Sequence, residues 1–337
     1  MKSLPFVSIC TPTFNRRPFI PFLKMCFLQQ TYPLDKMEWI IVDDGTDAVG
    51  DLTKDISQIK YYYFNEKMTL GKKRNIMHSL CKGEIIIYMD DDDYYPPERV
   101  SHAVNTLLKN PSYLIAGSSI LHIYFNELDE IYQFGPYGVY HSTAATFAFW
   151  RKLLDNTEYN QEKALAEETS FLKNYTIPLI QLDPIKTILV FAHCHNSFDK
   201  RRLLENPKEN KVTKSSYKPS DFIKNDILKQ FYVTDIHNLL VKYTEGSITL
   251  KPDVVKQIND IQEDREKRMT VFLQEKEAKQ KIQNSLTTNK KPNFTTVQET
   301  INYYEKVIED KSYLINELLK KIKKLTAELE EQKNKQV

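Results

Sequence analysis

The sequence lacks any long apolar stretch, because no segment of its 337 residues approaches the ~20 consecutive apolar residues that a membrane-spanning helix needs. No signal peptide is evident either, since MKSLPFVSIC leads into polar residues before a long apolar stretch begins. The four cysteines, Cys10, Cys26, Cys81 and Cys194, show no CxxC spacing, which argues against a zinc site or a disulfide framework. This use of cysteine fits a reducing compartment. We therefore expect a cytoplasmic protein without a transmembrane segment.

The chain also lacks an excess of charge and a glycine-rich phosphate loop. Its 47 Lys and Arg residues against 45 Asp and Glu residues give a formal net charge of +2, so no nucleic-acid partner is expected. No GxGxxG motif follows the first apolar segment, which argues against a dinucleotide enzyme and against nucleotidyl transfer. The hydrophobic fraction of 41% is sufficient for a globular core.

The first half of the chain alternates short apolar segments with helical patterns. We expect strands at residues 6–11, 39–42, 59–64 and 85–89, and helices at about 18–30, 70–81 and 97–110. Strands and helices that alternate at this spacing are typical of βαβ units. The sequence therefore predicts an α/β fold with a mostly parallel central sheet.

The second half predicts three further parts. Short strands are expected at 119–125, 131–134, 143–150 and 187–193, where they would complete the sheet and form the wall of a second-substrate site. A helical extension is expected over 203–290, and TTNKKPNFTT at 287–296 indicates a flexible break. A coiled coil is expected over 297–334.

The heptad pattern of the last part predicts its partner. Apolar residues recur every seven positions, with a second series three positions later that is best formed at Leu318 and Leu325. Ile at a with Leu at d favours a parallel two-stranded coiled coil, so we expect a homodimer or, alternatively, a trimer. The other interpretation is a single amphipathic helix that packs on its own domain. The a positions are Ile301, Ile308, Ile315, Ile322 and Leu329.

The most unusual segment is MDDDDYY, in which Asp90, Asp91, Asp92 and Asp93 follow directly after a predicted strand. Adjacent carboxylates repel, and each raises the cost of ionising its neighbour. The run is either a solvated acidic turn or a site for a divalent cation that offsets the repulsion. Polar residues also follow the first two strands, and in parallel sheets such strand ends form the ligand site. This convergence favours the cation site.

Four motifs follow one another in the first hundred residues: FVSICTPTFNR, WIIVDDGT, GKKRN and YMDDDDYYPPERV. In this order and spacing they resemble the family 2 glycosyltransferases, which have the nucleotide-diphospho-sugar transferase fold called GT-A. The resemblance is close over residues 6–99 and looser to about residue 196. It implies a GT-A glycosyltransferase domain over 1–202. The cytoplasm would be that of a bacterium or, for a viral protein, of the host cell.

The resemblance also assigns roles to the first turn. TPTFNR, with Thr11, Pro12 and Thr13, would bind the nucleobase of a nucleotide-sugar donor. The alternative is a polar turn in which Thr13 or Asn15 caps the next helix.

Two further motifs would contact the donor. Asp44 would accept a hydrogen bond from the base, with an Asx turn at Gly45 as the alternative. Arg74 would contact the base or the phosphates, since cations at a helix start oppose the helix dipole and suggest an anionic partner. Lys72 and Lys73 are expected to be solvated.

For the acidic run, the resemblance implies a Mn²⁺ or Mg²⁺ ion, because these ions prefer one or two carboxylates together with phosphates and waters. Asp92 would bind the metal. Asp90 and Asp91 would bind the ribose or metal-bound waters, with Asp90 counted among the metal ligands as well. Asp93 has no assigned role.

The candidate base for the acceptor lies in the segment ALAEETSFL, residues 164–172. Its acid pair resembles the family's catalytic pair, so Glu168 would be the general base, with Glu167 as the alternative. The competing interpretation is a pair of acids in a first helical turn. His193 and His195 would face the same side if the preceding strand continues, and one of them would be a further metal ligand or a phosphate contact. His195 is selected as the metal ligand, and a structural pair of histidines is the alternative.

Together these expectations describe a metal-dependent, inverting glycosyltransferase. It would transfer a sugar from a nucleotide-diphosphate donor, a UDP-sugar in the first instance, to a glycan, protein or lipid-linked acceptor. No QxxRW motif is visible, so the processive polysaccharide synthases are not a close guide. The alternative is a non-catalytic scaffold with a vestigial sugar-nucleotide domain and a coiled coil that brings partners together.

Overall fold

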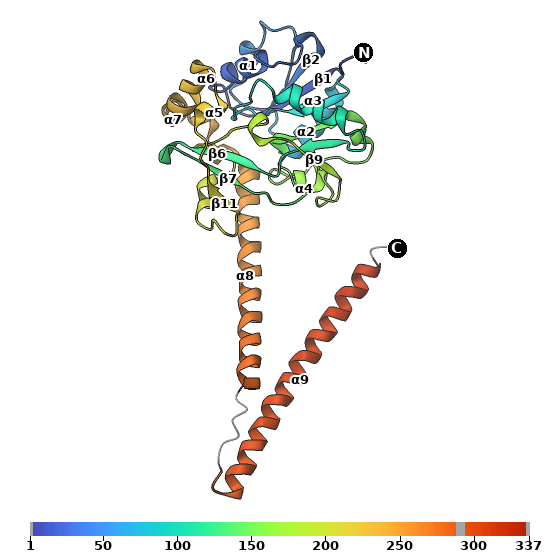
Figure 1. Ribbon diagram of the computed structural model, residues 1–337, viewed down its shortest axis with the longest axis vertical. Coiled ribbons are helices and arrows are strands. Elements are labelled where there is room, and N and C mark those ends of the chain that lie inside the picture. The colour runs from blue at the N-terminus through green and yellow to red at the C-terminus, as the bar shows by residue number, and fades with distance from the viewer. Residues whose placement is uncertain (1–2, 288–293, 335–337) are drawn as a thin grey trace. The chain divides into compact units, whose positions relative to one another are not determined.

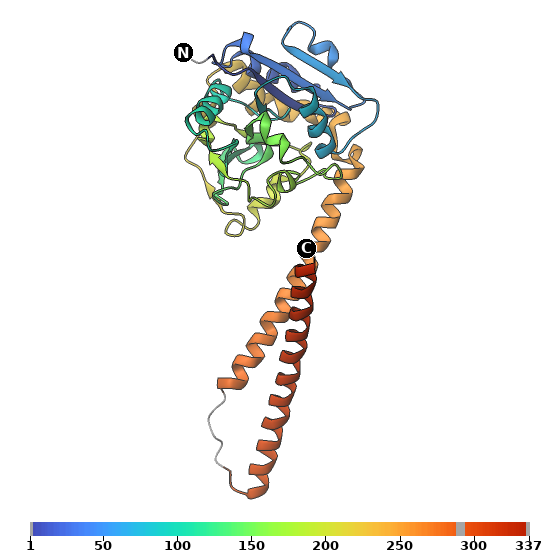
Figure 2. The ribbon, with the colours of Figure 1, turned by 90° about the vertical axis from the view of Figure 1, so that its right-hand side faces the viewer.

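The computed structural model describes residues 3–287 and 294–334. The chain forms two compact units, Met1–Asp260 and Ile261–Val337. The first unit holds all the strands (Figures 1 and 2). The boundary expected near residue 202 stays a prediction, and the expected break at 287–296 lies mostly outside the described residues.

The secondary structure follows the expected alternation in the first half. The strands are β1 (Val7–Thr13), β2 (Met37–Asp43), β3 (Ile59–Tyr63), β4 (Ile85–Tyr88), β5 (Ile115–Gly117), β6 (Leu121–Phe125), β7 (Glu130–Phe134), β8 (Ala148–Trp150), β9 (Leu179–Gln181), β10 (Val190–Ala192) and β11 (Val212–Lys214). The α-helices are α1 (Ile20–Leu28), α2 (Leu70–Leu80), α3 (Arg99–Lys109), α4 (Glu168–Phe171), α5 (Pro219–Phe222), α6 (Asp226–Gln230), α7 (Ile236–Lys242), α8 (Pro252–Thr287) and α9 (Val297–Asn334).

The central sheet has seven strands in the order β3-β2-β1-β4-β8-β5-β9. Neighbours pair in parallel except at β8, which runs antiparallel to both β4 and β5. The predicted α/β fold with a mostly parallel central sheet is therefore confirmed.

Both faces of this sheet are buried, as the apolar strands require. Ile9 of β1 and Ile87 of β4 face one core, in which side chains of α1 and α3 pack. Cys10 and Ile86, one position along each strand, face a second core with Met77 of α2. Successive side chains of a strand point to opposite faces. Because both faces are buried here, apolar residues occupy successive positions, and the strands appear in the sequence as nearly continuous apolar runs.

One expectation about the second half is wrong. Of the four short strands predicted to complete the central sheet, only the segment that becomes β8 joins it. The segments that become β6, β7 and β10 form a separate sheet with β11, in the order β10-β6-β7-β11. The central sheet is completed instead by β5 and β9, which are three residues long and leave little periodic signal in the sequence.

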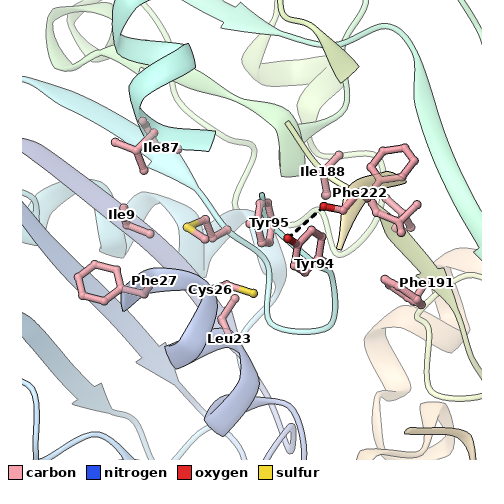
Figure 3. Close-up of a cluster of buried hydrophobic side chains, with 14 of the residues drawn as sticks. Ile9, Leu23, Cys26, Phe27, Ile87, Tyr94, Tyr95, Ile188, Phe191 and Phe222 are labelled. Atoms are coloured by element: carbon pink, nitrogen blue, oxygen red, sulfur yellow. Dashed lines mark hydrogen bonds between the residues drawn. The ribbon is translucent and has the colours of Figure 1, made fainter. Parts of the chain in front are cut away.

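The acidic run is anchored by the two tyrosines that follow it. Tyr94 and Tyr95 are buried, and Figure 3 shows them between side chains of the central sheet and α1 and side chains of the second-sheet region. Tyr94 exchanges backbone hydrogen bonds of 3.0 Å with Leu189, and its hydroxyl donates to the Phe222 carbonyl at 3.3 Å. The hydroxyl of Tyr95 accepts from the backbone N–H of Asp90 at 2.6 Å. Burial of two large rings therefore fixes the turn that carries the carboxylates.

The second unit contains most of α8 and all of α9, which Figure 1 shows as long helices. Within the described parts of the chain, no helix is both long enough and apolar enough to cross a membrane. The isoleucines at four of the a positions of α9 are between 45% and 63% exposed in the single chain. The coiled coil and the homodimer stay predictions.

Candidate functional site

A polar cavity of about 140 Å³ lies where β1 and β4 end, as expected for a parallel sheet. Six residues of the sequence-predicted site are on its wall, namely Pro12, Thr13, Arg74, Asp90, Asp91 and Asp92. The other basic wall residues are Arg16, Lys67, Lys73 and Lys251, and the other acidic one is Asp253.

The turn after β1 reaches the cavity through Pro12 and Thr13, whereas Thr11 points elsewhere. The Thr11 hydroxyl donates to the Met89 carbonyl at 2.5 Å and accepts from the indole N–H of Trp39 at 2.8 Å. Thr11 therefore ties β1 to its neighbouring strands. The hydroxyl oxygen of Thr13 is buried close to the Asp91 carboxyl, and it forms no well-aligned hydrogen bond with another described residue.

Asn15 and Arg16 hold the same turn in place. Asn15 has a φ of 51°, in the left-handed region that asparagine tolerates, and its amide contacts Thr46 at 3.2 Å and accepts from the backbone N–H of Asp47 at 2.9 Å. The Arg16 guanidinium lies 3.6 Å from Asp91 and 3.7 Å from Asp92. Arg16 is thus the basic neighbour of the acidic run.

The two aspartates after β2 have different tasks. Asp43 accepts hydrogen bonds from the backbone N–H groups of Gly45 (2.9 Å) and Val49 (3.0 Å), which is the Asx-type turn considered as the alternative for this motif. Asp44 has a fully buried side chain, accepts from the backbone N–H of Met68 at 2.6 Å, and pairs with the ammonium of Lys73.

Lys73 corrects one expectation. The sequence analysis expected a solvated side chain, but Lys73 is 4% exposed and its ammonium joins Asp44 to the Thr13 carbonyl at 2.8 Å. Burial lowers the pKa of Lys73, and the charge of Asp44 opposes that change. Lys73, not Asp44, presents the charge of this pair to the cavity. The role of Asp44 in base binding stays a prediction.

Arg74 connects the cavity to the acid pair. Its Nε donates to Glu167 at 2.9 Å, Nη2 lies 3.4 Å from Asp90, and its guanidinium lies 4.4 Å from the centre of the Tyr88 ring. The remaining nitrogen, Nη1, is buried with no hydrogen-bond partner among the described residues. The anionic partners predicted for this basic helix start therefore include the protein's own carboxylates, and Nη1 is left for a ligand.

The acid pair follows a strained residue. Ala166 has a φ of 52°, which costs a non-glycine residue roughly 1–2 kcal/mol. Glu167 is buried and held by Arg74, whereas Glu168, the first residue of α4, is partly buried and has no ion pair with another described residue. Burial, followed by the charge of Glu167, raises the pKa of Glu168 to about 7. The two acids therefore have different environments, as is typical of two neighbouring carboxyl groups that have different roles.

The aspartates of the acidic run also differ from one another in their environments. Burial and the charge of Asp92 raise the pKa of Asp91 to about 7. Although burial disfavours the charged form of Asp92, its hydrogen bond with His193 and the charges of His193 and Arg16 lower its pKa. Asp93 is buried, its carboxylate accepts from the backbone N–H of Phe191 at 3.1 Å, and its carbonyl accepts from the Tyr232 hydroxyl at 2.8 Å. Asp93, which had no predicted role, fastens the run to β10.

The histidine whose ring contacts the acidic run is His193, with Nε2 3.2 Å from Asp92. Strand β10 ends at Ala192, so the alternation that would place His193 and His195 on one side does not continue. The carbonyl of His195 accepts from Arg16 at 2.6 Å, and its ring Nδ1 is buried without a partner among the described residues. The assignment of His195 as a metal ligand stays a prediction.

The acidic run fits a hard divalent cation. Asp91 and Asp92 present carboxylate oxygens to the cavity and disfavour each other's ionised forms, so a cation there would relieve their repulsion. Among the described residues, no three His, Cys, Asp or Glu side chains are grouped closely enough to hold a metal ion by themselves. A cation at this position would therefore complete its coordination with phosphates and waters, as Mg²⁺ commonly does.

The sequence analysis missed residues whose partners are far away in the chain. Lys251 lies on the cavity wall more than 150 residues after the acidic run, in a segment without a recognisable motif. Lys73 and His193 are close in sequence to Arg74 and His195, which were selected as site residues. Only the ion pairs of Lys73 with Asp44 and of His193 with Asp92 show that Lys73 and His193 are part of the site.

Comparison with known proteins gives one family. Residues 8–168 match the family described as "Glycosyl transferase family 2". The chain is 32% identical over 106 residues to a putative colanic acid biosynthesis glycosyl transferase, WcaA, of Escherichia coli, covering 30% of this chain and 37% of the relative. It is 26% identical over 110 residues to a putative teichuronic acid biosynthesis glycosyltransferase, TuaG, of Bacillus subtilis, covering 31% and 43%. The chain spans less than half the length of these curated relatives.

A solved structure, the mannosyltransferase PcManGT of Pyrobaculum calidifontis in complex with GDP-Man and Mn²⁺, is 15% identical. Its similarity covers 73% of this chain and 74% of that chain, with a TM-score of 0.48.

Proposed function

We propose that the protein, whose residues 8–168 match glycosyl transferase family 2, transfers a sugar from a nucleotide-diphosphate donor to a hydroxyl acceptor. One observation carries the proposal. A cavity at the sheet edge brings Asp90, Asp91 and Asp92 together with several cationic side chains, and Arg74 on its wall donates a hydrogen bond to Glu167, the neighbour of the candidate base Glu168. Donor groups and a candidate base therefore belong to one connected site.

The cavity is suited to a diphosphate because its wall holds cationic groups that the protein leaves incompletely paired. Nη1 of Arg74 has no partner among the described residues, and charge-assisted hydrogen bonds to phosphate oxygens would satisfy it. Thr13 offers its hydroxyl near the same wall. We take a UDP-sugar as the first donor to test, as implied by the resemblance of the TPTFNR and VDDGT motifs.

Mn²⁺ or Mg²⁺ would be held by Asp92 with Asp91 or Asp90. When bound, the cation supplies positive charge to the departing diphosphate. Arg16 and Lys251 stand beside the same carboxylates, so the chain itself contributes charge of the required sign.

Glu168 is the proposed general base for the acceptor hydroxyl. Its carboxylate is not committed to an ion pair with another described residue, unlike that of Glu167, and a pKa of about 7 is suited to accepting a proton near neutral pH. Arg74 donates a hydrogen bond to Glu167, and burial together with the charge of Glu167 raises the pKa of Glu168. Direct displacement assisted by one base would invert the anomeric centre.

The decisive experiment combines binding and turnover. We expect the full chain to bind UDP in the presence of Mn²⁺ or Mg²⁺ by calorimetry, and to hydrolyse or transfer sugar from at least one donor in a screen of UDP-, GDP- and TDP-sugars. The configuration of the product, read by proton NMR, tests inversion. A chain that binds no nucleoside diphosphate with either metal would contradict the proposed function and favour a non-catalytic scaffold.

A further inference from the structure

A segment outside the family-matched region covers part of the donor cavity. We call residues 244–257 the closing segment. It contains two short 3-10 turns, Thr244–Gly246 and Ile248–Leu250, and the first turns of α8. Lys251, Asp253 and Val254 of this segment lie on the cavity wall. The cavity is therefore completed by chain that follows the matched residues by about 80 positions.

The closing segment is attached at both sides of the site. On the donor side, the Asn15 amide donates to the Glu245 carbonyl at 2.8 Å, and Arg16 donates to the Gly246 carbonyl at 3.1 Å. Lys67 pairs with Asp253. The segment thus rests on the same turn that the motifs assign to the nucleobase.

On the side of the acid pair, the attachment is made by Gln257. Its side-chain carbonyl accepts from the backbone N–H groups of Ala164 (2.9 Å) and Leu165 (3.2 Å), and its amide donates to the Glu162 carbonyl at 2.6 Å. These residues immediately precede Ala166 and the acid pair. The closing segment therefore bridges the donor turn and the segment that positions the proposed base.

Lys251 has the least compensated charge of the segment. It is 8% exposed, and its ammonium lies 3.5 Å from the Ser197 hydroxyl and 5.8 Å from the centre of the Phe14 ring. Burial, followed by the charge of Arg16, lowers the pKa of Lys251 to about 7. The charges of Asp91 and Asp92 oppose this change, but no carboxylate of the described residues forms an ion pair with the Lys251 ammonium, so an anion in the cavity would stabilise it. By contrast, Lys67 and Lys73 already have carboxylate partners.

The cavity is small for a donor. Sites for ligands of drug size, the class to which a nucleotide-sugar belongs, occupy roughly 300–1,000 Å³, whereas this cavity has about 140 Å³ with the closing segment in place. Lys251, Asp253 and Val254 form one wall, so a shift of the closing segment would enlarge the cavity.

Resting on the proposed function, we propose that Lys251 is a donor-binding residue whose ammonium contacts the diphosphate, and that residues 244–257 close over the bound donor. The contact is available only when the segment is closed, because Lys251 belongs to the segment itself. Closure also carries Gln257 onto residues 164 and 165, so donor binding and the position of the acid pair become linked.

The test measures affinity for UDP and GDP, with Mn²⁺ present, for the full-length wild type, Lys251→Ala, Lys251→Arg and Lys256→Ala. Lys256 is the matched control because it carries the same charge in the same closing segment, is exposed and is not on the cavity wall. We expect Lys251→Ala to lose about 10- to 100-fold in affinity for the diphosphate that the wild type binds, as is usual for a charged hydrogen bond. Lys251→Arg should retain most of it, and Lys256→Ala should match the wild type.

A second variant and a second readout keep the test independent of the lysine. In Gly246→Ala, the added Cβ would lie 2.6 Å from Nδ1 of His195 and 3.0 Å from the Asn15 carbonyl, so the segment would be displaced with Lys251 unchanged. We expect weaker diphosphate binding here also. In the wild type, amide hydrogen exchange in residues 244–257 should slow when UDP or GDP binds with Mn²⁺.

The outcomes separate the two proposals. If the wild type binds none of UDP, GDP and TDP with either Mn²⁺ or Mg²⁺, the proposed function fails. If the wild type binds one of them but Lys251→Ala binds it equally well, or exchange in 244–257 is unchanged, only the inference about the closing segment is overturned.

Discussion

At the scale of single residues, adjacent acids in one run have opposite tasks. Asp92 faces the cavity beside Arg16 and His193, whereas the Asp93 carboxylate binds the backbone N–H of Phe191. The proposed function needs a charge at Asp92, whereas the observed contact needs only a hydrogen-bond acceptor at Asp93. Neighbours in sequence therefore differ in which property of the carboxylate matters.

This difference predicts the outcome of two isosteric substitutions. Asp92→Asn removes the charge proposed to hold the cation and should lower sugar transfer by at least about 100-fold, since metal stabilisation of a leaving group contributes several kcal/mol. Asp93→Asn keeps an acceptor for Phe191 N–H and should retain activity close to that of the wild type. Steady-state rates at saturating Mn²⁺ measure both, and equal activity of Asp92→Asn and wild type would refute the assigned role of Asp92.

A third variant tests whether Asp93 stabilises the fold. Asp93→Ala leaves the buried N–H of Phe191 unpaired, so we expect a loss of about 1–3 kcal/mol in the free energy of unfolding. Thermal or urea unfolding measures it, with Asp93→Asn as the control that keeps the acceptor.

Glu168 predicts a pH dependence. A base with a pKa of about 7 is protonated and inactive below that pH and ionised above it. We therefore expect kcat/KM to rise about tenfold per pH unit below 7 and to level off above 7. Glu168→Gln should lose roughly 10²- to 10⁴-fold in kcat, while wild-type-like kcat in that variant would show that another group takes the proton.

At the scale of elements, the start of α2 positions the site. The helix begins with residues whose charges oppose its dipole, and Lys73 and Arg74 are held by Asp44 and Glu167 instead of by solvent. The same helix start packs on the segment that leads to the acid pair, since Gly71 N–H donates to the Lys163 carbonyl at 2.8 Å. α2 therefore connects the donor cavity and the proposed base.

Gly71→Ala tests this connection. A Cβ at position 71 would lie 2.1 Å from the Asn160 carbonyl oxygen, which is backbone and has to shift. We expect a loss of about 1–3 kcal/mol in stability, the usual cost of overpacking, and a lower kcat because the acid pair moves. The control is Gly138→Ala, where the added Cβ meets only the His141 Cβ at 3.6 Å. Similar stability and kcat in the two variants would contradict the proposed packing role of Gly71.

At the scale of the whole molecule, the heptads of α9 predict self-association. In the single chain Ile308, Ile315 and Ile322 are each more than half exposed, and a partner helix would bury them. We expect light scattering to give twice the mass of one chain. Ile315→Asp with Ile322→Asp should give a monomer whose sheet domain melts unchanged, whereas Lys306→Asp with Tyr313→Asp, at outer heptad positions, should stay dimeric. A monomeric wild type would reject the coiled coil.

How much the sequence foretold depends on the range of the interactions involved. The strands that become β1, β2, β3 and β4 and the helices between them were predicted to within about two residues at most ends, because apolar periodicity and turn residues act locally. The three-residue strands β5 and β9 were missed, since so short a segment has no period and exists only because β8 and its neighbours provide partners.

The sequence by itself determined the βαβ order, the family motifs and the acidic run at a strand end. Only the tertiary structure decided that Lys73 is buried against Asp44, that His193 is the histidine beside Asp92, that Asp93 binds the backbone of β10, and that Lys251 lies on the cavity wall. Each of these is a contact between residues far apart in the chain. Such contacts follow from which apolar faces pack together, and that choice is made by burial of the whole core and not by any local pattern.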